Sequence, residues 1–118
     1  MMKYIGITTF LVVLLLPTQS VAVGFAKHFK VDYVRVDKSG KGYIQFKSAL
    51  IGTSSGGPAS CTTTYVKALA FDTNTAGGQA ILSAALSAQA RDTTMYAIGT
   101  GKCDIYGVME DYSWGYTK

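Results

Sequence analysis

The sequence predicts a small, mainly β domain with one helix, in the order β-β-β-α-β-β. Three observations lead to this class. Short segments of alternating or β-branched residues are separated by glycine-containing turns. A single stretch, Ala76 to Arg91, consists almost wholly of helix formers. Two cysteines, Cys61 and Cys103, lie on either side of that stretch, and an even cysteine pair suits a small exported domain.

The first 22 residues predict a secretory signal peptide. Lys3 supplies a positive charge, residues 4–16 are almost wholly apolar, and small residues at Ser20 and Ala22 suit signal peptidase. The apolar run is shorter than the about 20 residues that a transmembrane helix needs, so we do not expect an integral membrane protein. Cleavage after Ala22 removes 22 of the 118 residues and leaves 96, which predicts one domain, residues 23–118, secreted or periplasmic.

Charge and cysteine content narrow the classes of function. Removal of Lys3 with the signal peptide lowers the formal net charge from +4 to +3, and the basic residues crowd the first third of the mature chain. Such a patch could meet acidic glycans or a membrane surface, or simply form a solvated face. A Cys61–Cys103 disulfide would close a loop of about 40 residues and stabilise the fold by about 4 kcal/mol. Two cysteines and one histidine, His28, do not make a ligand set, so the sequence predicts no metal and no cofactor.

The strand predictions rest on alternation and on β-branched residues. In the first strand Val34 and Val36 share one face, and Tyr33 and Arg35 lie on the other. A glycine turn then leads into the second strand and completes a hairpin. The segment before it, Val23–Phe29, is a weakly patterned lead-in, and Gly52–Ser60 is a flexible loop. The five predicted strands are Lys30–Asp37, Tyr43–Leu50, Thr62–Phe71, Thr94–Ile98 and Ile105–Tyr112.

The helix is predicted to begin after Thr75, which is a suitable N-cap. Gly77 and Gly78 fall in its first turn, where missing side chains let another backbone approach or an anion bind. An apolar face at helical spacing comprises Ile81, Leu82, Ala85, Leu86 and Gln89. A second face of small residues comprises Ala80, Ala84 and Ala88. That second face could pack on a neighbouring subunit or line a narrow channel, or it could reflect the helix propensity of alanine alone.

Three strands, a helix and two further strands is the order of the oligonucleotide/oligosaccharide-binding (OB) fold, a five-stranded barrel, stapled here by one disulfide. An open α+β sheet is the alternative. The signal peptide, the cysteine pair, the hairpin and the segment FDTNTAGGQAILSAALSAQA followed by MYAIGTGKC resemble small secreted bacterial proteins similar to the receptor-binding B subunits of pertussis- and subtilase-type AB5 toxins. The resemblance implies an OB barrel that binds sialylated glycans. It also implies a pentamer with its helices around a central pore, a position compatible with Ala80, Ala84 and Ala88, and a separate A subunit.

Glycan binding needs an aromatic platform with a few polar groups beside it. The sequence offers Tyr106, Tyr112, Trp114 and Tyr116 near its end, with Asp111 and Ser113 beside them, and we expect Tyr106 to belong to the core. These aromatic side chains could instead fill the core or complete an edge strand. A different class of function is a stand-alone secreted protein–protein interaction or inhibitor protein, for which the Gly52–Ser60 loop is a suitable contact segment.

Catalysis and nucleic-acid binding are not expected. Glu110 and Asp111 are adjacent, so in a strand their side chains point to opposite faces and do not form a catalytic pair. His28 has no nearby nucleophile in the sequence, which predicts no catalytic residues and no enzyme activity. Export separates the protein from its usual nucleic-acid partners, and the sequence does not interleave arginine with aromatic residues.

Overall fold

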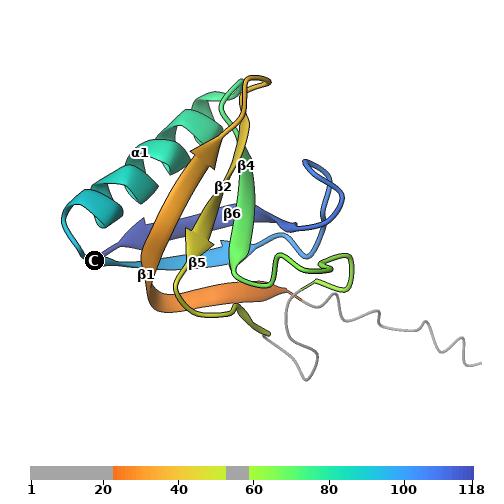
Figure 1. Cartoon of the computed structure of the whole chain (residues 1–118), viewed down its shortest axis with the longest axis horizontal. Helices are drawn as coiled ribbons and strands as arrows, with labels where there is room; N and C mark the ends of the chain where they lie inside the picture. Colours follow the sequence, from red (N-terminus) through yellow and green to blue (C-terminus); the bar gives the residue numbers. More distant parts are fainter. Residues whose placement is uncertain (1–22, 53–58) are drawn as a thin grey trace, which may run out of the picture.

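The computed structural model describes residues 23–52 and 59–118, so the predicted signal peptide and most of the Gly52–Ser60 loop lie outside the described residues. Within them the chain is mainly β with one helix, as predicted (Figure 1). The elements are β1 (Gly24–Val36), β2 (Lys41–Phe46), β3 (Ile51–Gly52), β4 (Ala68–Asp72), α1 (Ala76–Ala90), β5 (Thr94–Gly99) and β6 (Glu110–Thr117).

The strands form one six-stranded mixed sheet in the order β2-β4-β6-β5-β1-β3. β1 also pairs with β2, so the five strands other than β3 close into a ring. The β4–β6 pair is parallel, and the other pairs are antiparallel. α1 lies along one side of this curled sheet (Figure 1).

β1 closes the ring because it bends. Its first half pairs with β5 up to Lys30, and its second half pairs with β2 from Val31 onward. The pairing with β5 is irregular between Ala26 and Phe29, and His28 there has a φ of 57°. Such an irregularity turns a strand and weakens its alternating pattern. The weakly patterned lead-in Val23–Phe29 therefore belongs largely to the first strand, and the predicted start at Lys30 was too late.

The main core lies between the ring and the helix. Its largest members from the sheet are fully buried: Ile44, Phe46, Leu69, Phe71 and Met95. α1 contributes buried Ala85 and Ala88, with Ile81 and Leu82 packed against the cluster. Leu86, expected on the apolar face, is 47% exposed. The helix thus contacts the sheet with a narrower stripe than the sequence suggested, and its fully buried side chains there are Ala85 and Ala88.

The short strand β3 was not predicted, and the second predicted strand ends at Phe46 rather than Leu50. Two other predicted strands were misplaced. The third begins at Ala68 rather than Thr62, because residues 59–67 form turns, with the Thr62 amide donating to the Ala59 carbonyl and Ala68 to Tyr65. The fifth begins at Glu110 rather than Ile105, because the chain turns at Gly107, whose φ is 80°. The aromatic tail is consequently the second half of β6.

The predicted disulfide is confirmed. Cys61 and Cys103 are bonded, with their Cα atoms 6.1 Å apart. The bond joins the turns that precede β4 to the turn that follows β5. It therefore holds together two irregular segments that have few strand pairings of their own.

Candidate functional site

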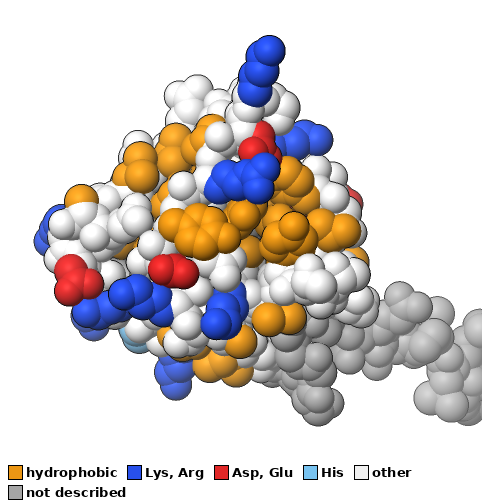
Figure 2. Space-filling view, in the orientation of Figure 1, with side chains coloured by type: hydrophobic (Ala, Val, Ile, Leu, Met, Phe, Trp, Pro, Cys, Tyr) orange, Lys and Arg blue, Asp and Glu red, His pale blue; other side chains and the backbone are white. Residues whose placement is uncertain are grey.

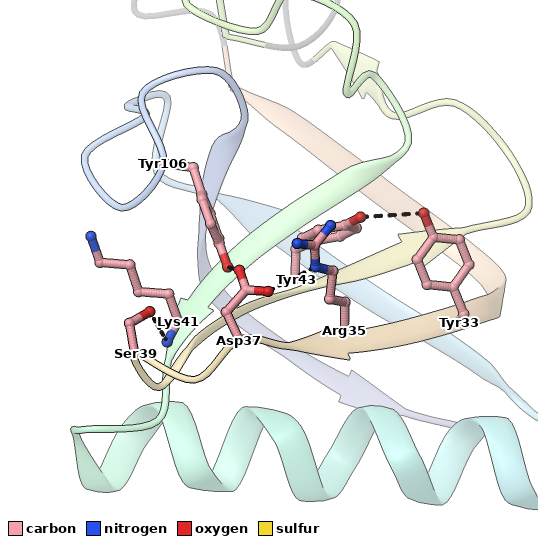
Figure 3. A network of polar contacts seen from close by, with 7 residues as sticks. All are labelled: Tyr33, Arg35, Asp37, Ser39, Lys41, Tyr43 and Tyr106. Carbon is pink, nitrogen blue, oxygen red and sulfur yellow. Dashed lines mark hydrogen bonds and ion pairs between the residues drawn. The ribbon is translucent and has the colours of Figure 1, made fainter.

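The side of β1 and β2 opposite α1 carries a cluster of tyrosines and charged residues (Figure 3). We call it the tyrosine surface, and it comprises Tyr33, Arg35, Asp37, Tyr43, Tyr65 and Tyr106. Ser39 of the β1–β2 turn and Lys41 at the start of β2 lie at one end of it (Figure 3). Figure 2 shows hydrophobic side chains exposed beside basic and acidic ones on this face of the molecule.

Tyr43 is the centre of the tyrosine surface. It is 5% exposed, and the rings of Tyr33, Tyr65 and Tyr106 approach it edge-on with centroids 6.0, 6.0 and 6.2 Å away. The hydroxyl oxygens of Tyr33 and Tyr43 are 3.3 Å apart, and this hydrogen bond raises the pKa of Tyr33. Tyr33 and Tyr65 are 43% and 38% exposed, so a buried ring is surrounded by rings that a ligand can reach.

A chain of polar contacts crosses this aromatic cluster. The Arg35 guanidinium lies over the Tyr43 ring, 5.8 Å from its centroid, and its Nε donates to Asp37 Oδ1 at 2.8 Å. The Tyr106 hydroxyl donates to the other carboxylate oxygen, Asp37 Oδ2. These bonds from Tyr106 and Arg35 hold the pKa of Asp37 below its usual value. Burial, followed by the bond to Asp37, raises the pKa of Tyr106, so this phenol stays protonated at neutral pH.

The arrangement presents a positioned cation among aromatic rings. The bond to Asp37 raises the pKa of Arg35, and its side chain is 57% exposed, so the terminal nitrogens can be reached from solvent. Such a guanidinium can donate two parallel hydrogen bonds to a carboxylate. Tyrosine rings beside it can contact the apolar face of a small polar ligand while their hydroxyls bind its polar groups.

The sequence pattern identified only part of this surface. Alternation placed Tyr33 and Arg35 on one face of the first strand, and in the structure Arg35 lies directly opposite Tyr43. Tyr65 and Tyr106 come from turns, where alternation gives no information about direction. The signal in the sequence that could have indicated them is the density of tyrosine around the hairpin.

The three predicted platform residues all belong to β6, where Trp114 has a neighbour from the set on either side. Trp114 and Tyr116 are 52% and 45% exposed on the outer face of β6. They flank Tyr96, at 5.8 and 5.2 Å between ring centroids, and His28 packs against Tyr96 at 5.5 Å. Tyr112 packs against the main core and also lines, with Trp114, a groove between β6 and α1, and burial raises its pKa. Tyr96, which is not among the predicted platform residues, is directly opposite Tyr116 in the β5–β6 register.

The three alanines of the proposed pore face have different environments. Ala88 is fully buried in the main core, Ala84 is half-buried and Ala80 is exposed. Ala80 and Ala84 line a groove of about 220 Å³ between α1 and β6. The other residues that line it are Ile81, Tyr112, Trp114 and Gly115. Two of the three alanines are thus available to a second surface, and the third packs on the molecule's own sheet.

Glu110 and Asp111 are both buried, at 0% and 7% exposure, and their carboxylates bind different segments. Asp111 accepts hydrogen bonds from the backbone amides of Asp104 and Ile105, while burial raises its pKa. Glu110 accepts hydrogen bonds from amides of other segments, among them Gly24. Each carboxylate therefore anchors backbone, and the two do not meet.

In the described ranges no three histidine, cysteine or acidic side chains are placed to hold a metal ion. No helix among these same residues has the length and apolar character needed to cross a membrane. Comparison with known proteins found no matching family model, no matching curated protein and no matching solved structure.

Proposed function

We propose that this chain is a secreted, non-enzymatic glycan-binding protein resembling the B subunit of an AB5-type toxin, and that the tyrosine surface is its binding site. The observation that carries the proposal is the Arg35 guanidinium, held between Asp37 and the Tyr43 ring and beside partly exposed tyrosines. A sugar presents an apolar C–H face and a set of hydroxyls, which suit rings and phenols respectively. The carboxylate of a sialylated glycan would pair with Arg35.

The proposed fold is an OB barrel. Two features support it: the ring order β1-β2-β4-β6-β5, and the single parallel pair that β4 and β6 make within that ring. The disulfide and the amino-terminal composition support a secreted or periplasmic location.

We also propose that the protein forms a homo-oligomer. The resemblance to AB5 B subunits implies a pentamer and an unidentified A subunit as a further partner. Among the described strands, β6 pairs with β4 as far as Asp111 and beyond that residue has a neighbour, β5, on one side. The groove between α1 and β6 runs beside this open edge. A strand edge next to an apolar groove is a surface that a neighbouring polypeptide can cover.

Glycan binding is tested on a glycan array with the exported, oxidised protein. We expect sialylated glycans to bind and Arg35→Lys to weaken them by about 10- to 100-fold, because lysine cannot make the paired hydrogen bonds. Arg91→Lys is the matched control, since Arg91 lies at the carboxyl end of α1 and outside the tyrosine surface. Trp114→Ala tests the alternative platform on β6 and should leave binding unchanged.

The second candidate function, a secreted interaction or inhibitor protein, has its own observation. Trp114 and Tyr116 are exposed on a face that includes no part of the tyrosine surface. An array on which the wild-type protein binds no glycan would contradict glycan binding. Recovery of one stoichiometric protein from a periplasmic or host extract, lost in Trp114→Ala, would then favour the interaction protein.

A further inference from the structure

The Glu110 carboxylate is fully buried and holds three distant segments of the chain. Its Oε1 accepts hydrogen bonds from the amides of Gly24 at 3.0 Å and Ala59 at 2.9 Å. Its Oε2 accepts from the amides of Gly101 at 3.0 Å and Gly24 at 3.1 Å. A Cβ atom at Gly99 would lie 1.8 Å from Oε2, so this glycine leaves the room that the carboxylate occupies. We call these five residues the Glu110 pocket.

The Glu110 pocket compensates a negative charge with amide dipoles. The ion pairs found in the described ranges, Lys30–Asp92 and Arg35–Asp37, both lie outside it. Burying a carboxylate is costly unless hydrogen bonds and an opposite charge replace the lost water. The amides supply the hydrogen bonds, and a positive charge near Gly24 would supply the opposite charge.

Removal of the signal peptide creates such a charge next to Gly24. Hydrolysis of the peptide bond between Ala22 and Val23 consumes one water, leaves a carboxylate on Ala22 and frees the nitrogen of Val23, which takes up a proton at neutral pH. Before cleavage that same nitrogen belongs to a neutral amide. We propose that the new α-ammonium of Val23 pairs with Glu110 and fixes the start of β1. The inference rests on the predicted export and cleavage, and it is independent of glycan binding.

Covalent geometry places the ammonium within reach. Standard bond lengths put the nitrogen atoms of neighbouring residues at most about 3.7 Å apart. The Gly24 nitrogen is 3.0 Å from Oε1. The Val23 nitrogen is therefore within about 7 Å of the carboxylate, and a rotation at the new chain end can shorten this distance. Val23 is half-buried, so the pair would be partly shielded from water, where an ion pair is stronger than at the surface.

The test moves the ammonium and leaves the pocket intact. A Gly-Ser dipeptide inserted between Ala22 and Val23 shifts the charge by about 7 Å of extended chain. Intact mass of the exported proteins verifies where each one begins. We expect the insertion to lower Tm by about 4–8 °C in the wild-type background and to have no further effect in Glu110→Gln. Asp111→Asn is the control background, in which the insertion should keep its full effect, because Asp111 binds other amides.

Several results would overturn the inference. An unchanged Tm on insertion means that the ammonium does not pair, and an equal loss in Glu110→Gln means that it pairs elsewhere. A wild-type mass beginning at a residue other than Val23 removes the first step and leaves glycan binding untouched. Should Glu110→Gln fail to fold, the pairing is tested instead by the acylation rate of the α-amine at neutral pH, compared between the wild-type protein and the insertion variant. We expect it to be at least about 10-fold slower in the wild-type protein than in the insertion variant, because a paired ammonium loses its proton less readily. Equal rates contradict the pairing.

Discussion

The Asp37 carboxylate binds two side chains of different chemistry, a guanidinium and a phenol. One carboxylate oxygen accepts from Arg35 Nε and the other from the Tyr106 hydroxyl, so a residue from β1 and a residue from a turn are held together. The guanidinium is thereby kept over the Tyr43 ring, where it would meet a ligand without having to be ordered first. The two bonds also determine how Asp37 titrates.

We expect Tyr106→Phe to raise the pKa of Asp37 toward its ordinary value, because the Tyr106 bond is the largest cause of the lowering. A carboxyl group with a lowered pKa stabilises the fold above its unfolded pKa and loses that contribution as the pH falls through its folded pKa. The stability difference between the two proteins should therefore be present at neutral pH and narrow below about pH 4. A carbon NMR titration of the Asp37 carboxyl measures the shift. Tyr65→Phe is the control, since Tyr65 packs against Tyr43 rather than bonding to Asp37. An equal rise of the Asp37 pKa in that variant would contradict the role given to the Tyr106 hydrogen bond.

Residues within regular strands could be placed from the sequence, and residues in turns could not. Alternation put Tyr33 and Arg35 on one face because strand side chains have a period of two. Tyr106 follows Cys103 in a segment whose direction depends on the Gly107 turn and on the two amides that Asp111 binds. That information lies in tertiary contacts, so the part of the candidate site contributed by turns was not predictable.

α1 begins where a cap and a close backbone approach coincide. The Thr75 hydroxyl accepts a hydrogen bond from the Gly78 amide at 2.9 Å and donates to the Asp72 carbonyl at 2.8 Å. The same carbonyl oxygen would lie 1.7 Å from a Cβ atom at Gly78, whereas a Cβ at Gly77 would meet nothing within 4 Å. The helix therefore starts tightly against the end of β4, and the two adjacent glycines have different reasons to be there.

This difference predicts opposite effects of the same substitution. Gly78→Ala should destabilise the protein by about 1–3 kcal/mol or more, because its methyl group clashes with backbone that cannot easily move. Gly77→Ala should be neutral or stabilising by up to about 1 kcal/mol, because alanine is the better helix former. Chemical denaturation of both oxidised variants measures the change. Two variants of equal stability would contradict this prediction. They would show that the Asp72 carbonyl group moves to make room for a methyl group at position 78, so that close backbone approach is not the reason for glycine there.

Element types were predictable where the pattern was long and regular, as in the helix and the β1–β2 hairpin. Element limits failed where the backbone departs from regular geometry. The irregularity around His28 hid the first half of β1, and the Gly107 turn moved the last strand toward the end of the chain. β propensity alone made a strand of residues 62–67, but it is a weak guide outside its tertiary context.

At the scale of the whole molecule, closure of the strand ring and the disulfide both hold in place segments that a small core anchors only weakly. A chain of this size buries a modest core, so segments without strand partners need other links. The Cys61–Cys103 bond, the Asp111 carboxylate and the Glu110 pocket all hold the turns that surround the end of β5 and the start of β6. That end of the molecule is consequently well anchored, while β6 beyond Asp111 keeps an edge without a described strand partner.

The open edge of β6 predicts self-association through the α1–β6 groove. Light scattering on the exported, oxidised protein should give five times the mass of the mature monomer. Ala84→Glu should reduce this mass to that of the monomer, because it places a charge in an apolar groove that the neighbour would cover. Ser83→Glu is the matched control: it adds the same charge one residue away, at an exposed position outside the groove lining, and the assembly should persist. A monomeric wild-type protein would remove the pentamer and leave a single-copy binding protein. An assembly that survives Ala84→Glu would assign the interface to another face, for which the aromatic side chains around Tyr96 are the next candidate.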